Sequence, residues 1–147
     1  MEHDFGYGPV EAHRHSNGGG WIADTAIVAE TVCVGADARV SGDARVYGRA
    51  RVSGNARVSG NARVYGDARV YGDARVSGDA RVSGIMRSDG YCFVAVPCAD
   101  GLKRVIAGCR YFTYEEAVAH WEQTRQGTPL GDETFAILKF FKDTNQL

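Results

Sequence analysis

The chain has 147 residues, 44% of them apolar, and a net charge of −1 from 17 basic and 18 acidic side chains. No apolar run is long enough to span a membrane, and the polar start at residues 1–4 lacks the features of a secretory signal. The lack of an apolar run excludes a membrane protein, and the near-neutral charge excludes a strongly basic nucleic-acid-binding domain. From the length we expect one compact protein, and we expect it to be cytoplasmic.

Residues 1–21 carry no repeat and form the expected N-terminal cap segment. The glycine run at 18–20 predicts a flexible stretch that ends abruptly at Trp21. Because Trp21 directly precedes the repeat, we expect its side chain to cover the open end of the first coil. His13 and His15 fall on one side of an extended chain, but two histidines without a third ligand do not make a metal site, and we expect none.

A six-residue repeat occupies residues 22–87, and a typical unit is Gly42–Tyr47, with the sequence GDARVY. An aliphatic residue returns every six positions, and a small apolar residue follows four positions after most of them. In an extended chain both point to one side, so each unit predicts a short strand with one apolar face. The residues expected to point inward are Ile22, Val28, Val34, Val40, Val46, Val52, Val58, Val64, Val70, Val76 and Val82, with Ala26, Val32, Ala38, Ala44, Ala50, Ala56, Ala62, Ala68, Ala74 and Ala80.

A glycine recurs in most units and predicts a corner, because glycine adopts positive φ without steric cost. A glycine at every sixth position would cost an α-helix roughly 1 kcal/mol each time, which excludes a helix. Hexapeptide periods indicate a β-solenoid, in which the chain turns in the same sense at every corner. The eleven units predict a little under four coils, about 15–20 Å tall.

The aliphatic residue and the small residue four positions later resemble the hexapeptide-repeat family, and the whole chain resembles its small bacterial and phage members with an α/β tail. The resemblance implies a left-handed parallel β-helix of triangular cross-section, with three units in each coil. The expected fold is therefore mainly β: a short left-handed parallel β-helix, or β-solenoid, of about four coils, followed by a C-terminal β-hairpin and two α-helices. The glycine lies two positions after the aliphatic residue, whereas the family more often has it one position after.

Residues 88–147 have a different pattern and form the expected C-terminal cap or oligomerisation region. The segments 91–96 and 103–108 predict two strands, joined through a turn at 99–101. This tail is dense in aromatic residues and is expected to cover the last coil, to form a dimer interface, or to do both.

Two helices are expected to complete the tail. Thr113 and Glu116 have the spacing of a capping box, which predicts a helix that runs to about Thr124. A loop follows, and the last helix is expected to start at Asp132.

The four cysteines show no Cys-x-x-Cys spacing, which indicates reduced thiols and neither a disulfide framework nor a zinc site. They are Cys33, Cys92, Cys98 and Cys109.

One activity implied by the family resemblance is acyl transfer from coenzyme A or an acyl carrier, with active sites between the prisms of a trimer and a histidine as general base. All four histidines of this chain lie outside residues 22–87, and no insertion interrupts the repeat. These observations favour a non-enzymatic protein with no catalytic residue and no cofactor. An acyltransferase-like enzyme that uses His120 as its base stays open as an alternative.

The outward-facing residues supply the candidate binding site. Residues eighteen apart stack on the predicted solenoid, so each of its three faces carries a column of arginines. Residues 37–84 contain nine arginines and five aspartates, a local net charge of +4. Arginine and tyrosine are enriched in binding hot spots, and we expect the partner-binding residues to be Arg49, Arg51, Arg69, Tyr71, Arg87, Tyr47 and Tyr65.

The leading hypothesis is a non-enzymatic protein-binding or scaffold module, a rigid solenoid that presents ladders of Arg, Asp and Tyr to a protein partner. We also expect self-association as a dimer or a trimer. A specific form of the hypothesis is a phage-encoded, anti-CRISPR-like inhibitor that docks on a host defence complex. Nucleic acid is a less favoured partner, because aspartates are interleaved with the arginines and the repeat has no lysine.

Overall fold

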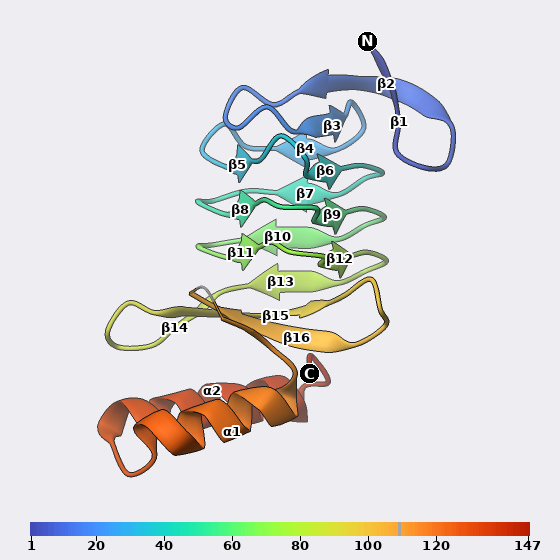
Figure 1. The fold of residues 1–147 in the computed structure, drawn as a ribbon. Helices are drawn as coiled ribbons and strands as arrows, with labels where there is room; N and C mark the ends of the chain where they lie inside the picture. The colour runs from blue at the N-terminus through green and yellow to red at the C-terminus, as the bar shows by residue number, and fades with distance from the viewer. Residues whose placement is uncertain (109) are drawn as a thin grey trace.

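The computed structural model describes residues 1–108 and 110–147. A parallel β-solenoid of about four turns forms the middle of the molecule. A β-hairpin lies at its N-terminal end, and an antiparallel sheet with two helices lies at its C-terminal end (Figure 1). Cys109 lies outside the described residues. Within the described ranges, neither helix is long and apolar enough to cross a bilayer.

Three stacks of short parallel strands form the walls of the solenoid, and residues eighteen apart are paired, as at Val46 and Val64. The strands run one rung above the next, which confirms the predicted stacking. The left-handed sense of the coil stays a prediction from the family resemblance. We name the three walls by their outward residues.

The serine face consists of β3 (Trp21–Ala23), β6 (Arg39–Val40), β9 (Arg57–Val58) and β12 (Arg75–Val76). The tyrosine face consists of β4 (Ile27–Val28), β7 (Arg45–Val46), β10 (Arg63–Tyr65) and β13 (Arg81–Ser83). The arginine face consists of β5 (Cys33–Val34), β8 (Arg51–Val52) and β11 (Arg69–Val70).

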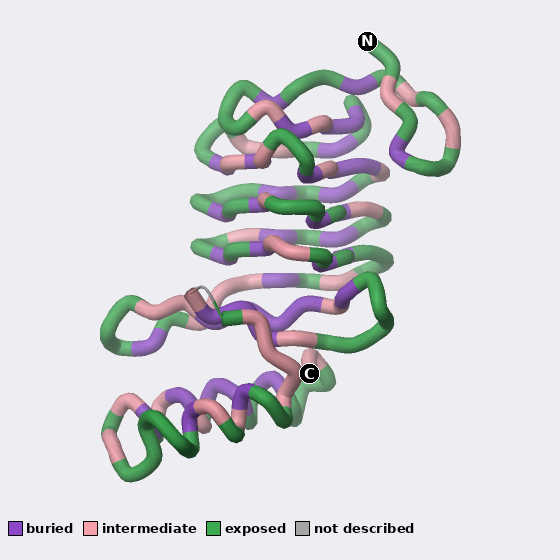
Figure 2. Tube along the Cα trace, viewed as in Figure 1, coloured by how far each residue is buried: buried purple, intermediate pink, exposed green. Residues whose placement is uncertain are grey.

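The interior of the solenoid consists of columns of valine and alanine. From Val32 to Val76 the inward residues of the repeat are all fully buried, and purple segments recur along the coils (Figure 2). Full burial of a valine contributes about 1.5–3 kcal/mol relative to an exposed one. The predicted inward positions are therefore confirmed in the middle coils, whereas Val28 and Ala80 near the two ends are only half-buried.

Glycine makes the corners of the middle and lower coils. Every sixth residue from Gly42 to Gly78 has φ between 61° and 75°. This left-handed backbone region costs other residues about 1–2 kcal/mol, which explains why glycine recurs there.

The N-terminal segment forms a hairpin of β1 (Glu2–Asp4) and β2 (Pro9–Arg14) that extends the sheet of the serine face, because β2 pairs antiparallel with β3. The expectation that Trp21 covers the first coil is wrong. Trp21 pairs with Arg39 and has the outward register of the arginine column, so the tryptophan ring lies on the outside.

The segment around His15 covers the first coil instead. The His15 side chain is buried, and its Nε2 lies 2.7 Å from the carbonyl oxygen of Val32. Gly20 donates its N–H to the carbonyl of Val34 at 2.9 Å. The glycine run predicted to be flexible is thus hydrogen-bonded to the top rung of the arginine face.

The C-terminal sheet has four antiparallel strands: β14 (Ile85–Met86), β15 (Cys92–Pro97), β16 (Lys103–Ala107) and β17 (Arg110–Phe112). The predicted hairpin corresponds to β15 and β16, and the two short outer strands were not predicted. Side chains alternate across β15, so that Val94 and Val96 enter the solenoid core while Phe93 and Ala95 face the helices. The sheet therefore closes the last coil, as expected.

Helix α1 (Tyr114–Arg125) begins with the predicted capping box. Thr113 Oγ1 accepts a hydrogen bond from the Glu116 N–H at 3.3 Å, and Glu116 Oε1 accepts one from the Thr113 N–H at 3.0 Å. The buried Trp121 of this helix packs on Phe93 of the sheet, with ring centroids 5.3 Å apart.

Helix α2 (Pro129–Asp143) starts three residues before the predicted Asp132. Thr128 is its N-cap and accepts a hydrogen bond from the Gly131 N–H at 3.0 Å, while Pro129 occupies the first helical position, where its missing N–H has no cost. Leu138 on this helix is buried against the sheet.

Candidate binding groove on the arginine face

A groove of about 440 Å³ lies where the arginine face meets the C-terminal sheet. The repeat loses its register at Ile85, so the next rung of this face is missing and the connection into β15 takes its place. The residues that line the groove are Arg49, Arg51, Asp67, Arg69, Met86, Gly90, Tyr91, Cys92 and Gly108.

Three arginines give the groove its charge. Arg51 lies directly above Arg69 in the paired strands β8 and β11, and Arg49 occupies the corner position where other units have Asp or Asn. Asp67 is the one carboxylate in the lining. Among residues 1–108 and 110–147, no carboxylate lies within 4.0 Å of any of the three guanidinium groups. The groove thus holds a net charge of +2 and favours an anionic ligand.

The thiol of Cys92 lies at the floor of the groove, and its Sγ is 3.6 Å from the carbonyl oxygen of Asp67. Burial raises the pKa of Cys92 above its ordinary value, so the thiol is protonated at neutral pH. A protonated thiol is a poor nucleophile, and the half-buried Cys92 side chain packs against the solenoid core. In the described part of the chain, no three His, Cys, Asp or Glu side chains gather as metal ligands would.

Tyr71 was predicted to be a partner-binding residue, and it is half-buried beside the groove. Its hydroxyl donates to the carbonyl oxygen of Gly108, and its ring lies 6.4 Å from that of Tyr111. Tyr71 therefore fastens Gly108, which follows β16, to the arginine face. The groove takes part of its wall from this contact, because Gly108 lines it.

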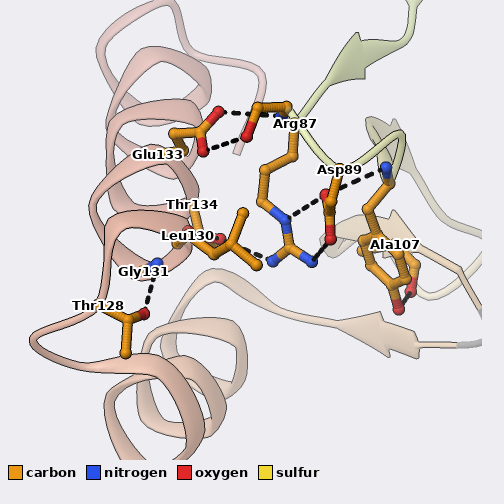
Figure 3. Close-up of polar contacts among 10 residues, drawn as sticks. Arg87, Asp89, Ala107, Thr128, Leu130, Gly131, Glu133 and Thr134 are labelled. Carbon is orange, nitrogen blue, oxygen red and sulfur yellow. Dashed lines mark hydrogen bonds and ion pairs between the residues drawn. The ribbon is translucent and has the colours of Figure 1, made fainter.

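Arg87 does not join the other arginines. Its side chain is buried between the C-terminal sheet and α2, where the guanidinium binds Asp89 and donates to Thr134 Oγ1 at 3.0 Å (Figure 3). The sequence analysis grouped Arg87 with Arg49, Arg51 and Arg69 as partner-binding residues. The structure separates Arg87 from them, because the chain leaves the repeat at Ile85 and turns beneath the last coil.

Tyr47 and Tyr65 lie on a different wall, the tyrosine face. Their rings are stacked with centroids 5.6 Å apart, and 43% of Tyr47 is exposed. A second groove of about 370 Å³ runs along this face and is lined by Asp43, Arg45, Asn61, Arg63, Asp79 and Arg81. The structure therefore brings together three of the seven predicted residues, places Tyr71 at their side, and separates the other three.

The floor of the arginine-face groove was missed by the sequence analysis. Met86, Tyr91 and Cys92 reach it only because the C-terminal sheet folds back under the solenoid. The sequence around these three residues contains no repeat and no motif from which this contact could be predicted. The aromatic Tyr91 also donates a hydrogen bond to the carbonyl of Ala107 at 2.8 Å, which fixes its ring (Figure 3).

His120 lies in a neighbouring groove on α1. Its ring packs 5.1 Å from both Phe112 and Trp121. Burial, followed by the nearby charges of Arg110 and Arg125, lowers the pKa of His120. The imidazole is thus neutral at pH 7, but the charged groups that act on it are cations and not an orienting carboxylate.

Comparison with known proteins found one family. The model described as the YdcK beta solenoid repeat matches residues 38–50, 50–66, 56–72 and 62–77, all within the solenoid. No curated protein and no solved structure matched the chain. The matched segments cover the middle coils, where the valine and alanine columns are fully buried. Sequence and structure together identify the central region as a β-solenoid repeat similar to that of YdcK.

Proposed function

We propose that this protein is a non-enzymatic binding module whose arginine-face groove holds an acidic segment of a protein partner. The observation that carries the proposal is the set of three arginines, Arg49, Arg51 and Arg69, that line one groove without an ion pair to any described carboxylate. Guanidinium groups bind carboxylates through paired hydrogen bonds. A partner carboxylate therefore gains contacts that the chain itself does not supply.

Rigidity of the scaffold supports the same proposal. The strands that carry Arg51 and Arg69 are anchored inward by Val52 and Val70, which are fully buried. A site on a packed solenoid loses little conformational freedom when a partner binds. We further assign the repeat to the hexapeptide-repeat class, on the strength of its unbroken six-residue period, and we propose that the chain forms a dimer or a trimer.

The acyltransferase alternative has no specific observation in its favour. The groove beside His120 is lined by Arg110 and Arg125, and the coils themselves contain no histidine. A phage inhibitor of a host defence complex would also bind a protein partner, so a pull-down for protein partners tests that hypothesis too.

The test is an affinity pull-down from nuclease-treated bacterial lysate with the wild-type chain and two charge-reversal variants. Arg51→Glu with Arg69→Glu reverses the groove. Arg45→Glu with Arg63→Glu is the matched control, because those arginines form the equivalent exposed pair on the tyrosine face. We expect a stoichiometric protein that the groove variant loses at least tenfold and that the control retains.

Equal loss from the groove variant and the control would refute the assignment to the arginine face. Recovery of no protein besides the chain itself would refute the binding module. Circular dichroism of both variants establishes that the solenoid is intact, since all four arginines are exposed and project outward.

A further inference from the structure

The serine face carries a third groove, and the N-terminal hairpin forms one side of it. The connection between β1 and β2 hangs beside the upper coils (Figure 1) and brings Phe5 and Tyr7 against the arginine column of β6, β9 and β12. The groove has a volume of about 260 Å³. It is lined by Phe5, Tyr7, Arg39, Ser41, Arg57, Ser59, Arg75 and Ser77.

The wall of this groove is a double ladder. Arg39, Arg57 and Arg75 are paired in register from rung to rung, and each is followed two residues later by a serine. Ser41 is buried, whereas Ser59 is half-buried and Ser77 is exposed. Rungs of a sheet are about 4.8 Å apart, so the three arginines span about 10 Å. Among the residues the structure describes, no carboxylate lies within 4.0 Å of these three guanidinium groups.

The hairpin holds Tyr7 in place at one end of the ladder. Asp4 Oδ1 accepts hydrogen bonds from the N–H groups of Gly6 at 2.7 Å and Gly8 at 3.0 Å, which closes the loop around Tyr7. Phe5 is buried against the hairpin and stacks on Tyr7 with ring centroids 6.3 Å apart. Because 60% of Tyr7 is exposed, its ring offers a free surface for stacking.

Trp21 lies on the same face but does not offer such a surface. His3 stacks on its ring at 4.4 Å, and the guanidinium of Arg14 lies 4.4 Å from the ring centroid. Tyr7 is therefore the aromatic residue that is available at this groove.

We propose that the serine face binds single-stranded nucleic acid, with phosphates on the arginine ladder and on Ser59 and Ser77, and a base stacked on Tyr7. A positive groove that tracks the backbone, together with an aromatic ring that stacks on a base, is the arrangement that binds single strands without sequence preference. An acidic peptide would also meet the arginines, but it would make no use of the exposed ring. The proposal is independent of the arginine-face groove.

The tyrosine face provides a matched comparison. It carries the same ladder of three arginines, Arg45, Arg63 and Arg81. Each face adds two aspartates and one asparagine at the neighbouring corner positions. The arginine ladders and corner residues of the two faces therefore carry the same charge. The serine face adds its serines and the hairpin, whereas the tyrosine face has Tyr47, Tyr65 and Ser83 at the serine positions, with the two tyrosine rings stacked on each other. A specific site on the serine face predicts that the oligonucleotide binds there and not to the tyrosine face. Simple charge attraction predicts equal binding to the two faces.

The experiment measures fluorescence anisotropy of a labelled ten-nucleotide thymidine oligodeoxynucleotide against the full chain, from 20 to 200 mM salt. Three phosphate contacts predict a log–log salt slope of about −2, since each contact to a single strand contributes about −0.7. Arg57→Gln is expected to make the slope shallower by about 0.7. Tyr7→Ala is expected to raise Kd at least fivefold, because it removes the stacking surface.

The triple variant Arg39→Gln, Arg57→Gln, Arg75→Gln is expected to abolish the binding, and the triple variant Arg45→Gln, Arg63→Gln, Arg81→Gln to change Kd less than twofold. Equal weakening by both triples would overturn the proposal, as would no binding at 20 mM salt.

An unchanged Kd for Tyr7→Ala would also overturn it, and displacement of the oligonucleotide by a poly-glutamate peptide at equal charge would then identify an acidic protein as the occupant. The variant Arg51→Glu with Arg69→Glu is expected to keep oligonucleotide binding, which separates this site from the proposed protein-binding groove.

Discussion

Arg87 and Asp89 form a two-point ion pair beneath the last coil, with Nε to Oδ1 at 2.8 Å and Nη2 to Oδ2 at 2.7 Å. Arg87 is only 5% exposed, whereas the Asp89 side chain is 36% exposed. The ion pair therefore joins a buried cation to a carboxylate that contacts solvent. The third contact of the guanidinium, to Thr134, joins the turn after β14 to α2. Arg87 thus connects the end of the solenoid to the helices.

Arg87→Met is expected to destabilise the chain by roughly 2 kcal/mol, because it removes charged hydrogen bonds and the contact to Thr134 while it keeps most of the buried volume. Urea denaturation followed by circular dichroism measures the change. Arg45→Met, on an exposed side chain of β7, is the control and should change stability by less than about 0.5 kcal/mol, the usual range for surface substitutions. An Arg87→Met variant as stable as the control would contradict the connecting role.

The Asp89 carboxylate also makes the stability of the fold depend on pH in the acid range. The side-chain hydrogen bonds from Arg87 lower the pKa of Asp89 from 3.8 to about 2. Because the folded pKa lies below the unfolded one, the stabilisation is fully present above about pH 4 and is lost as the pH falls toward 2. We expect the stability difference between wild type and Asp89→Asn to shrink over that window. A difference that stays constant from pH 5 to pH 2 would exclude this pair as its source.

The glycine corners make a paired prediction. Gly60 and Gly78 both have φ of 62°, but a Cβ on Gly60 would lie 2.8 Å from the N of Gly78, whereas a Cβ on Gly78 meets nothing within 4 Å. Gly78→Ala is expected to cost about 1–2 kcal/mol from the backbone alone. Gly60→Ala should cost about 1–3 kcal/mol more, because the coil below must move. Equal thermal denaturation midpoints for the two variants would show that the corners do not stack this closely.

Val64→Asp tests the valine column. Val64 is fully buried between Val46 and Val82 of the tyrosine face, so an aspartate there would bury a charge without a partner, at roughly 3–5 kcal/mol. We expect loss of the folded state by circular dichroism and by thermal denaturation. Arg63→Asp is the control, since its side chain is exposed one residue away, and it should remain folded. A folded Val64→Asp chain would refute the inward assignment.

The solenoid could be predicted from the sequence because its determinants are local and repeated. Each valine, such as Val52, has the same neighbours in every unit, so one correct interpretation of the period fixes all the inward positions. The cluster of Arg49, Arg51 and Arg69 follows from the same register, and the structure places these residues in one groove.

The positions that the sequence did not predict correctly lie near the two ends of the six-residue repeat. Trp21 stands at an arginine position, and it faces outward because β2 adds a strand above it. Arg87 turns inward because the chain leaves the repeat at Ile85. Tyr91 reaches the groove from a segment whose packing partner is distant in sequence. Each of these positions is decided by tertiary packing, which a local pattern does not encode.

The C-terminal sheet has a consequence for how the length of such a chain can vary. Ala99 N–H bonds to the carbonyl of Asp73, and Cys98 pairs with Ala74, so β15 is attached to one particular wall of the last coil. An insertion of one six-residue unit would rotate that attachment by a third of a turn relative to the N-terminal hairpin. An insertion of three units would add a rung to every wall and leave both ends in their present orientation. Lengthening is therefore tolerated in whole coils, and each added coil would extend all three arginine columns at once.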